Sequence, residues 1–263
     1  EGTLFIETSG KVVGQMNGLS VYALGDHAFG RPSRITAIAA LGRDGVVAID
    51  REAQLAGNIH NKGVLILAGY LKSCFAQDKP LTLSASLTFE QSYGMVEGDS
   101  ASGAELVALL SAITELPLAQ NIAMTGSVSQ RGESQPIGGV NWKIEGFYKA
   151  CKARGLDGTQ GVIIPKANVQ DLMLKKEVVD AVQEGRFHVW AIGHIDEALE
   201  LLTGLPAGKR LEDGTWEPDT VNDKVDRKLR HMMELARELM RTEEGPKPSS
   251  PPPPSGACPT CPG

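Results

Sequence analysis

Short apolar runs broken by glycine alternate with helical patterns through the first 205 residues of this chain. Residues 81–90 (LTLSASLTFE) alternate apolar and small polar side chains, which is typical of a half-buried strand. Similar runs predict strands at 19–24, 34–41, 46–50, 121–128, 161–165 and 187–192. Helical spacing predicts helices at 64–74, 106–113, 138–154, 168–184 and 194–203. Because these elements mix without a strict βαβ repeat, we expect an α+β fold with mixed sheets and packed helices.

The composition changes after Gly208. We therefore divide the chain into a main domain at 1–205, a helical extension at 206–244 and a Pro-rich flexible tail at 245–263. The extension carries one apolar stripe on a charged helix, formed by Val221, Val225, Leu229, Met232, Ala236 and Leu239. We expect this stripe to pack on the main domain or on a neighbouring subunit. The tail ends in Cys258 and Cys261, whose CxxC spacing supplies only half of a zinc site, so we expect no structural metal within the chain.

Composition excludes several classes of function. The net charge of -6 gives no electrostatic footprint for nucleic acid. No apolar run approaches the ~20 residues that span a bilayer, so we expect no membrane partner. The two remaining cysteines, Cys74 and Cys151, are interpreted as small buried hydrophobes, which suits a reducing cytoplasm. The chain begins at Glu1 rather than Met, and we expect that it was cut from a longer chain or processed.

Two short segments carry residues with catalytic chemistry. In VEGDSASG (96–103), Ser100 follows a glycine-acid turn at the start of a predicted helix. A serine hydroxyl becomes a nucleophile when a base lies beside it, and N–H groups at a helix start can stabilise an oxyanion. The same residue types also cap helices. Ser102 and Glu105 fit a capping box, so we expect Ser102 to cap the helix while Ser100 faces a cleft.

The second segment, PIGGVNWK (136–143), places Lys143 early in another predicted helix. A lysine accepts a proton only when burial keeps its amine neutral near pH 7, and the apolar neighbours of Lys143 favour such a site. Thr125, at the end of a predicted strand, has a hydroxyl that could hold the amine in place. Taken singly, such residues are more often a solvated surface lysine and a plain strand threonine.

Competing centres are absent from the sequence. The five histidines show no metal-ligand spacing, and no phosphate-binding P-loop is present, so we expect no metal, no ATP site and no cofactor in this chain. His60 and Lys62 could belong to a substrate groove, but such a pair more often marks the exposed start of a helix.

In combination, these motifs resemble the proteolytic domain of the Lon proteases, also called endopeptidase La. The resemblance covers roughly residues 10–205 and rests on EGDSAS at 97–102, AMTGSVSQRGESQPIGGVNWKIEG at 123–146 and VIIPKANVQDL at 162–172. The EGDSAS form resembles the archaeal-type branch and its bacterial relatives. The resemblance implies Ser100 as nucleophile, Lys143 as base, Thr125 as its support, and Asp99 as an acidic residue that influences assembly of the site.

The resemblance also implies an α+β proteolytic fold, a six-membered ring and unfolded or damaged proteins as substrates. Most family members carry an ATP-driven module before this domain, and this chain has none, so we expect either that the module was removed or that the protein works without ATP. We expect substrates to bind as an extended strand at a sheet edge. One alternative is a silent chaperone-like or assembly module, in which ionised Asp99 keeps Lys143 protonated. Another is an assembly protein that cleaves only itself.

Overall fold

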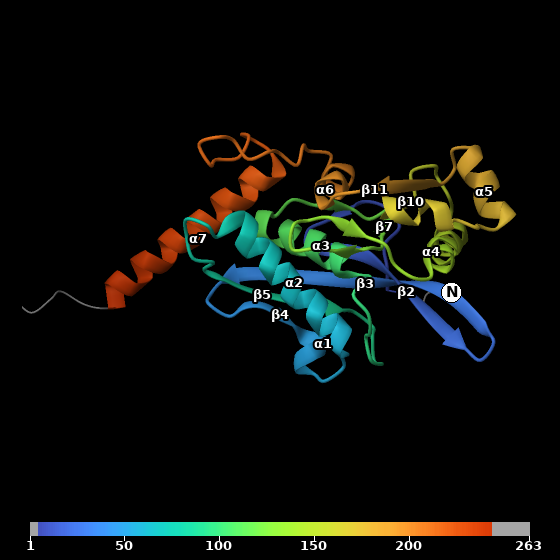
Figure 1. The fold of residues 1–263 in the computed structure, drawn as a ribbon, viewed down its shortest axis with the longest axis horizontal. Helices are drawn as coiled ribbons and strands as arrows, with labels where there is room; N and C mark the ends of the chain where they lie inside the picture. Colours follow the sequence, from blue (N-terminus) through green and yellow to red (C-terminus); the bar gives the residue numbers. More distant parts are fainter. Residues whose placement is uncertain (1–4, 244–263) are drawn as a thin grey trace, which may run out of the picture.

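A computed structural model describes residues 5–243 of the chain (Figure 1). Its centre is a seven-stranded mixed sheet with the order β11-β10-β7-β2-β3-β5-β4. The strands are β2 (Gln15–Leu24), β3 (His27–Leu41), β4 (Gly45–Ala48), β5 (Leu83–Phe89), β7 (Ile122–Met124), β10 (Gly161–Pro165) and β11 (His188–Ile192). Two small two-stranded sheets join β1 (Lys11–Val12) to β6 (Leu118–Ala119) and β8 (Ser127–Val128) to β9 (Ser134–Gln135).

The long hairpin of β2 and β3 joins the two halves of the sheet. All ten residues of β2 pair with β3, from Gln15 opposite Thr36 to Leu24 opposite His27. On its other edge β2 pairs with β7 only at Asn17 and Gly18. Beyond Gly18, this edge of β2 therefore has no strand partner in the described part of the chain.

Helices cover both faces of the sheet because successive strand residues point to opposite sides. In β7, Ile122 and Met124 join one apolar cluster, while Ala123 between them joins the other. The larger cluster packs the sheet against α2 (Asn58–Phe75), α3 (Ser102–Thr114), α6 (Ile195–Thr203) and α7 (Val221–Glu243). The smaller cluster packs it against α4 (Val140–Arg154) and α5 (Lys176–Gln183). Two shorter elements are α1 (Ile49–Glu52) and the 3-10 helix η1 (Lys166–Asp171).

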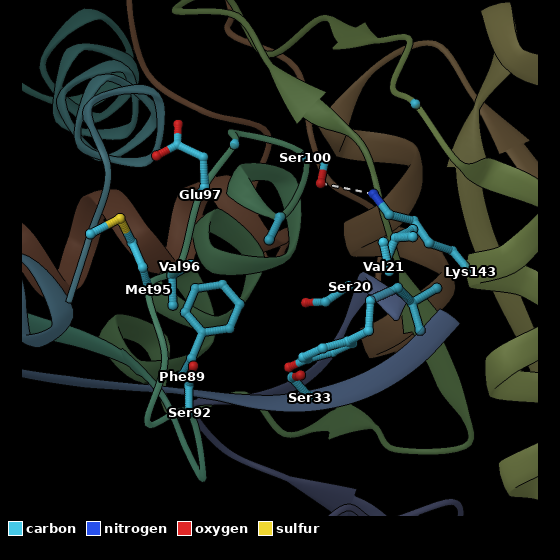
Figure 2. A pocket seen from close by; sticks show the side chains of 16 residues that line it. Ser20, Val21, Ser33, Phe89, Ser92, Met95, Val96, Glu97, Ser100 and Lys143 are labelled. Carbon is cyan, nitrogen blue, oxygen red and sulfur yellow. Dashed lines mark hydrogen bonds between the residues drawn. The ribbon is translucent and has the colours of Figure 1, made fainter. Parts of the chain in front are cut away.

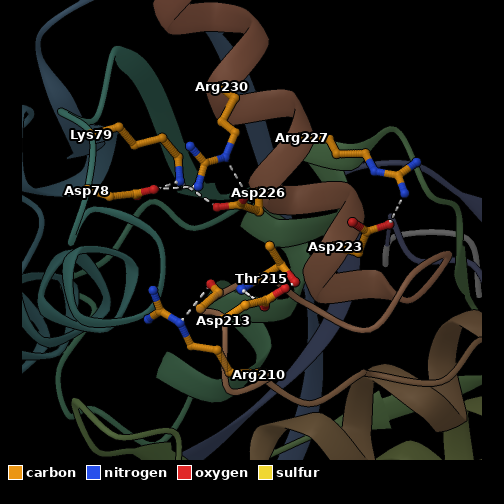
Figure 3. A network of polar contacts seen from close by, with 10 residues as sticks. Asp78, Lys79, Arg210, Asp213, Thr215, Asp223, Asp226, Arg227 and Arg230 are labelled. Carbon is orange, nitrogen blue, oxygen red and sulfur yellow. Dashed lines mark hydrogen bonds and ion pairs between the residues drawn. The ribbon is translucent and has the colours of Figure 1, made fainter.

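Helix α7 is held to the body by apolar and charged contacts. Four residues of its predicted stripe are buried in the larger cluster, namely Val221, Val225, Leu229 and Met232. Figure 3 shows Asp78 and Lys79, from the loop after α2, meeting Asp226 and Arg230 of α7. The predicted packing of the stripe on the main domain is thus confirmed for the first half of α7. In the second half, Leu239 is exposed.

The mixed sheet and packed helices confirm the predicted α+β class, but several boundaries differ. The helix predicted at 168–184 is wrong as one element, because η1 and α5 are separate and Leu172 between them is extended. The strand predicted at 121–128 divides into β7 and β8, because Gly126 has φ +148, which a β-carbon would make costly. The strand predicted at 46–50 ends at Ala48, where α1 begins.

The division at residues 205 and 244 stays a prediction. Residues 244–263, with Cys258 and Cys261, lie outside the described residues. Cys151 is buried as predicted, whereas Cys74 is only partly buried. No helix within residues 5–243 is long and apolar enough to cross a membrane.

Candidate active site

Ser100 lies in a turn that leads from the end of β5 into α3, and the turn is fixed on two sides. On one side, Gly57 N donates to Val96 O (2.9 Å) and Val96 N donates to Leu55 O (2.8 Å), which ties the preceding loop to the start of α2. On the other side, Gly126 N donates to Ser100 O (2.8 Å). The nucleophile candidate is therefore held between α2 and the end of β7.

Lys143 comes from the first turn of α4, and two glycines bring that helix against β3. A β-carbon on Gly30 would lie 1.9 Å from Trp142 O, and one on Gly146 would lie 2.1 Å from Gly30 O. Both distances are far below van der Waals contact, so only glycine permits this approach of backbone to backbone. The close packing determines how far the Lys143 side chain reaches across the sheet.

The side chains of Lys143, Ser100 and Thr125 meet in one hydrogen-bonded group. Lys143 Nζ lies 2.8 Å from Ser100 Oγ and 3.1 Å from Thr125 Oγ1. The Thr125 hydroxyl in turn donates to Ser100 O (3.2 Å). The sequence separates Ser100 and Lys143 by 43 positions, and the fold brings them into contact.

Burial changes the acidity of the amine. Lys143 is 3% exposed, and loss of water lowers the pKa of its amine from 10.5 to about 8, against the opposing charge of Asp99. About a tenth of the lysine is then neutral at pH 7, whereas an ordinary lysine is almost wholly charged. A neutral amine at this position can accept a proton near neutral pH.

Asp99 lies next to Ser100 but forms no ion pair with Lys143 within 4.0 Å among the described residues. Its influence on the amine is a longer-range electrostatic one. The direct pairing that would keep Lys143 protonated in a silent module is thus not seen in residues 5–243.

Two expectations about neighbouring residues are wrong. Ser102 does not cap α3, because Ala101 is the N-cap and no side chain caps the helix; the Ser102 hydroxyl instead accepts from Val128 N (3.1 Å). His60 is not an exposed helix-start residue, since it is 1% exposed and its ring meets Phe89 edge to face. Local patterns suit both expectations, and tertiary packing overrides them.

A cleft of about 440 Å³ opens at the Ser100–Lys143 contact (Figure 2). One wall is the unpaired edge of β2, with Ser20 and Val21. The opposite wall is apolar, with Phe89, Met95 and Val96. Periodicity in the sequence predicted the strands that carry Ser20, Val21 and Phe89, but it did not indicate the part of the wall at 92–98, which is an irregular loop. No group of three or more potential metal ligands occurs within residues 5–243.

Comparison with known proteins gives one family. Residues 94–204, which include Ser100, Thr125 and Lys143, match the Lon protease (S16) C-terminal proteolytic domain. A putative Lon protease homolog of Escherichia coli K12 is 51% identical over 204 residues, which is 77% of this chain and 35% of that protein. A putative Lon protease homolog of Haemophilus influenzae is 44% identical over 228 residues, or 86% of this chain and 38% of that protein. An archaeal Lon protease of Pyrococcus abyssi is 34% identical over 196 residues, or 74% of this chain and 18% of that protein. The match thus spans little more than a third of each bacterial relative.

Proposed function

Because this chain belongs to the Lon protease family through its S16-type C-terminal proteolytic domain, we propose that it is a serine endopeptidase that uses Ser100 and Lys143 as a catalytic dyad. The observation that carries the proposal is the 2.8 Å contact between Lys143 Nζ and Ser100 Oγ, at a buried amine whose pKa is lowered to about 8. A nucleophile beside a base that a third group orients is the general arrangement for covalent catalysis.

In the proposed cycle, the lone pair of neutral Lys143 takes the Ser100 proton as Ser100 Oγ attacks the scissile carbonyl carbon. The resulting ammonium group then donates that proton to the leaving amine, and an acyl-enzyme remains. Water repeats the route, with Lys143 again the base, and frees the acid and Ser100. Thr125 keeps Nζ aimed at Ser100 throughout.

The negative charge on the tetrahedral intermediate needs donors close to Ser100. The backbone N–H groups of Ser100 and Ala101 lie directly before α3, and they donate to no acceptor within residues 5–243. Unpaired amides at a helix start are suited to an oxyanion. We assign them as the oxyanion donors.

Unfolded or damaged protein chains are the proposed substrates. An extended peptide adds to the unpaired edge of β2 beyond Gly18 through backbone hydrogen bonds, which tolerate varied sequences. The apolar wall of Phe89, Met95 and Val96 favours apolar side chains at the cleavage site. A homo-hexameric ring, with an ATPase module in a longer parent chain, completes the proposal.

Incubation with casein tests this function. The unaltered chain is expected to produce fragments at equal rates with and without ATP, because its sequence has no P-loop. Ser100→Ala should abolish cleavage while circular dichroism shows an intact fold. Undiminished cleavage by Ser100→Ala rejects the dyad, and casein that is bound but left intact by the unaltered chain supports a silent binding module.

A further inference from the structure

Three ionisable side chains are buried together behind the cleft, and the proposed dyad uses none of them. Asp50 lies in α1, His60 in the first turn of α2 and Glu105 in the first turn of α3, and all three are at most 5% exposed. His60 Nε2 lies 3.8 Å from Glu105 Oε1, and it has no hydrogen-bond partner. Burial of such groups is costly unless they satisfy one another, so their placement together is unusual.

Each member of this cluster touches a residue next to the cleft. Asp50 Oδ2 accepts from Phe89 N (3.1 Å), and the His60 ring packs edge to face on the Phe89 ring with centroids 5.6 Å apart. Phe89 lines the cleft. Glu105 N donates to Ala101 O (2.9 Å), directly after the turn that carries Ser100. The cluster therefore contacts the apolar wall through Phe89, and Glu105 stands in the helical turn directly after the turn that carries Ser100.

The surroundings of the cluster favour uncharged forms of two members. Burial raises the pKa of Glu105 to about 8, and the charge of Asp50 acts in the same direction. Burial lowers the pKa of His60, while the charges of Asp50 and of Glu97 from the cleft loop oppose that change. A neutral carboxyl group has one proton to donate, and a neutral imidazole has one nitrogen that accepts. His60 Nε2 is the buried atom that lacks a partner.

We propose that protonated Glu105 closes the 3.8 Å gap to His60 Nε2 and shares its proton with that nitrogen, and that this pair, supported by Asp50, positions Ser100 and Phe89 for catalysis. The inference rests on the proposed peptidase function. Glu105 and His60 are positioning residues, since neither touches Ser100 or Lys143 in the structure. When Glu105 loses its proton, a second buried negative charge appears beside Asp50. Repulsion then displaces the first turn of α3, and Ser100 moves with it.

Cleavage of a fluorogenic peptide with an apolar residue at the scissile bond, between pH 6 and pH 10 at 25 °C, tests the proposal. We compare the unaltered chain with Glu105→Gln, whose amide donates a hydrogen bond but does not ionise, and with Glu52→Gln, a control at an exposed carboxyl of α1. The unaltered chain and Glu52→Gln should lose kcat by about tenfold from pH 8 to pH 9.5, where few Glu105 side chains remain protonated. The kcat of Glu105→Gln should stay constant over the same pH range. The same alkaline loss in Glu105→Gln would overturn the proposal.

A second measurement does not depend on peptidase activity. In the Ser100→Ala variant with ¹⁵N-labelled histidine, His60 Nε2 should give the NMR shift of a hydrogen-bonded acceptor below pH 8 and lose that shift as pH rises through 8. The double variant Ser100→Ala, Glu105→Leu should lack this shift at every pH. The double variant Ser100→Ala, His60→Asn assigns the signal, because the His60 peak is the one that it lacks. If the Nε2 shift is the same with and without Glu105→Leu, His60 and Glu105 do not share a proton. Cleavage retained by Ser100→Ala would instead reject the peptidase proposal and leave the cluster measurement valid.

Discussion

Lys143 Nζ lies 2.8 Å from Ser100 Oγ, although Lys143 belongs to α4 and Ser100 to the turn before α3, and these helices pack on opposite faces of one sheet. Lys143 reaches the serine from the first turn of α4, and Ser100 is held at the start of α3. Thr125, the residue directly after β7, bonds to both Lys143 Nζ and Ser100 O. The catalytic potential of the site depends on the packing of these three elements.

Loss of the Thr125 hydroxyl should slow catalysis without removing it. Thr125→Val keeps the shape of the side chain but removes the bonds to Lys143 Nζ and Ser100 O. Because misplaced reacting groups cost much of the rate, we expect kcat for a fluorogenic peptide to fall roughly 10- to 100-fold. Thr125→Ser, which restores the hydroxyl, should recover most of the rate. Equal rates for the valine variant and the unaltered chain would exclude this supporting role.

Protonation of Lys143 should govern the acid side of the pH profile. Only the neutral amine accepts a proton, and the pKa of Lys143 is about 8, so kcat/KM should rise nearly tenfold per pH unit between about pH 5.5 and pH 7.5. The charge of Asp99 raises this pKa, and Asp99→Asn should therefore shift the rise to lower pH. Initial rates in buffers of constant ionic strength measure both effects. A shift of the rise to higher pH would contradict the assigned influence of Asp99.

The buried amine should lower stability at neutral pH. The pKa of Lys143 is depressed in the fold, so the Lys143 side chain makes its full contribution to the free energy of unfolding only above about pH 10.5. That contribution is lost as pH falls through about 8. Lys143→Met removes this cost but also two hydrogen bonds, and it should stabilise the fold at pH 7 by about 1–2 kcal/mol. Urea unfolding at pH 7 and pH 10.5 checks the sign. The gain should vanish at the higher pH, and a gain that persists there would point to packing instead.

The contact of Lys79 with Asp226 should stabilise the docking of α7. The Lys79 side chain is 1% exposed and pairs with Asp226 and Asp78 (Figure 3). Because Lys79→Met leaves buried carboxylate charge with less compensation, we expect a loss of about 2–4 kcal/mol in the free energy of unfolding. Lys176→Met, which breaks the exposed pair with Asp180, should cost less than about 0.5 kcal/mol. Similar losses for the two variants in urea unfolding would refute a special role for Lys79.

A side chain at Gly30 should displace α4, the helix that carries Lys143. The added β-carbon of Gly30→Ala would lie 1.9 Å from Trp142 O and 2.7 Å from the Lys143 α-carbon, so the backbone of α4 must move. Since a shift of about 1 Å in a reacting group is costly, kcat should fall by roughly 100-fold or more. Gly94→Ala is the control, because its β-carbon meets nothing within 4 Å. Peptidase activity of Gly30→Ala equal to that of the control would show that α4 does not depend on this contact.

The sequence by itself determined the types of most elements and the chemistry of the candidate site. Alternating apolar residues at 81–90 correctly predicted β5, and the helical spacing from Leu106 correctly predicted α3, because periodicity follows directly from burial of one face. The segments around Ser100 and Lys143 indicated a candidate nucleophile and a candidate base, since a hydroxyl and an amine can take these roles once they are placed together.

Only the tertiary structure decided which side chains contact one another and which are buried away from water. Ser102 had the sequence of a cap, but packing turned its hydroxyl toward Val128 N. His60 had the sequence of an exposed helix start, yet it is buried against Phe89 of β5 and beside Glu105 of α3. The lowered pKa of Lys143 likewise depends on loss of water around α4. Desolvation and long-range contact arise when distant segments pack, and local sequence does not encode either quantity.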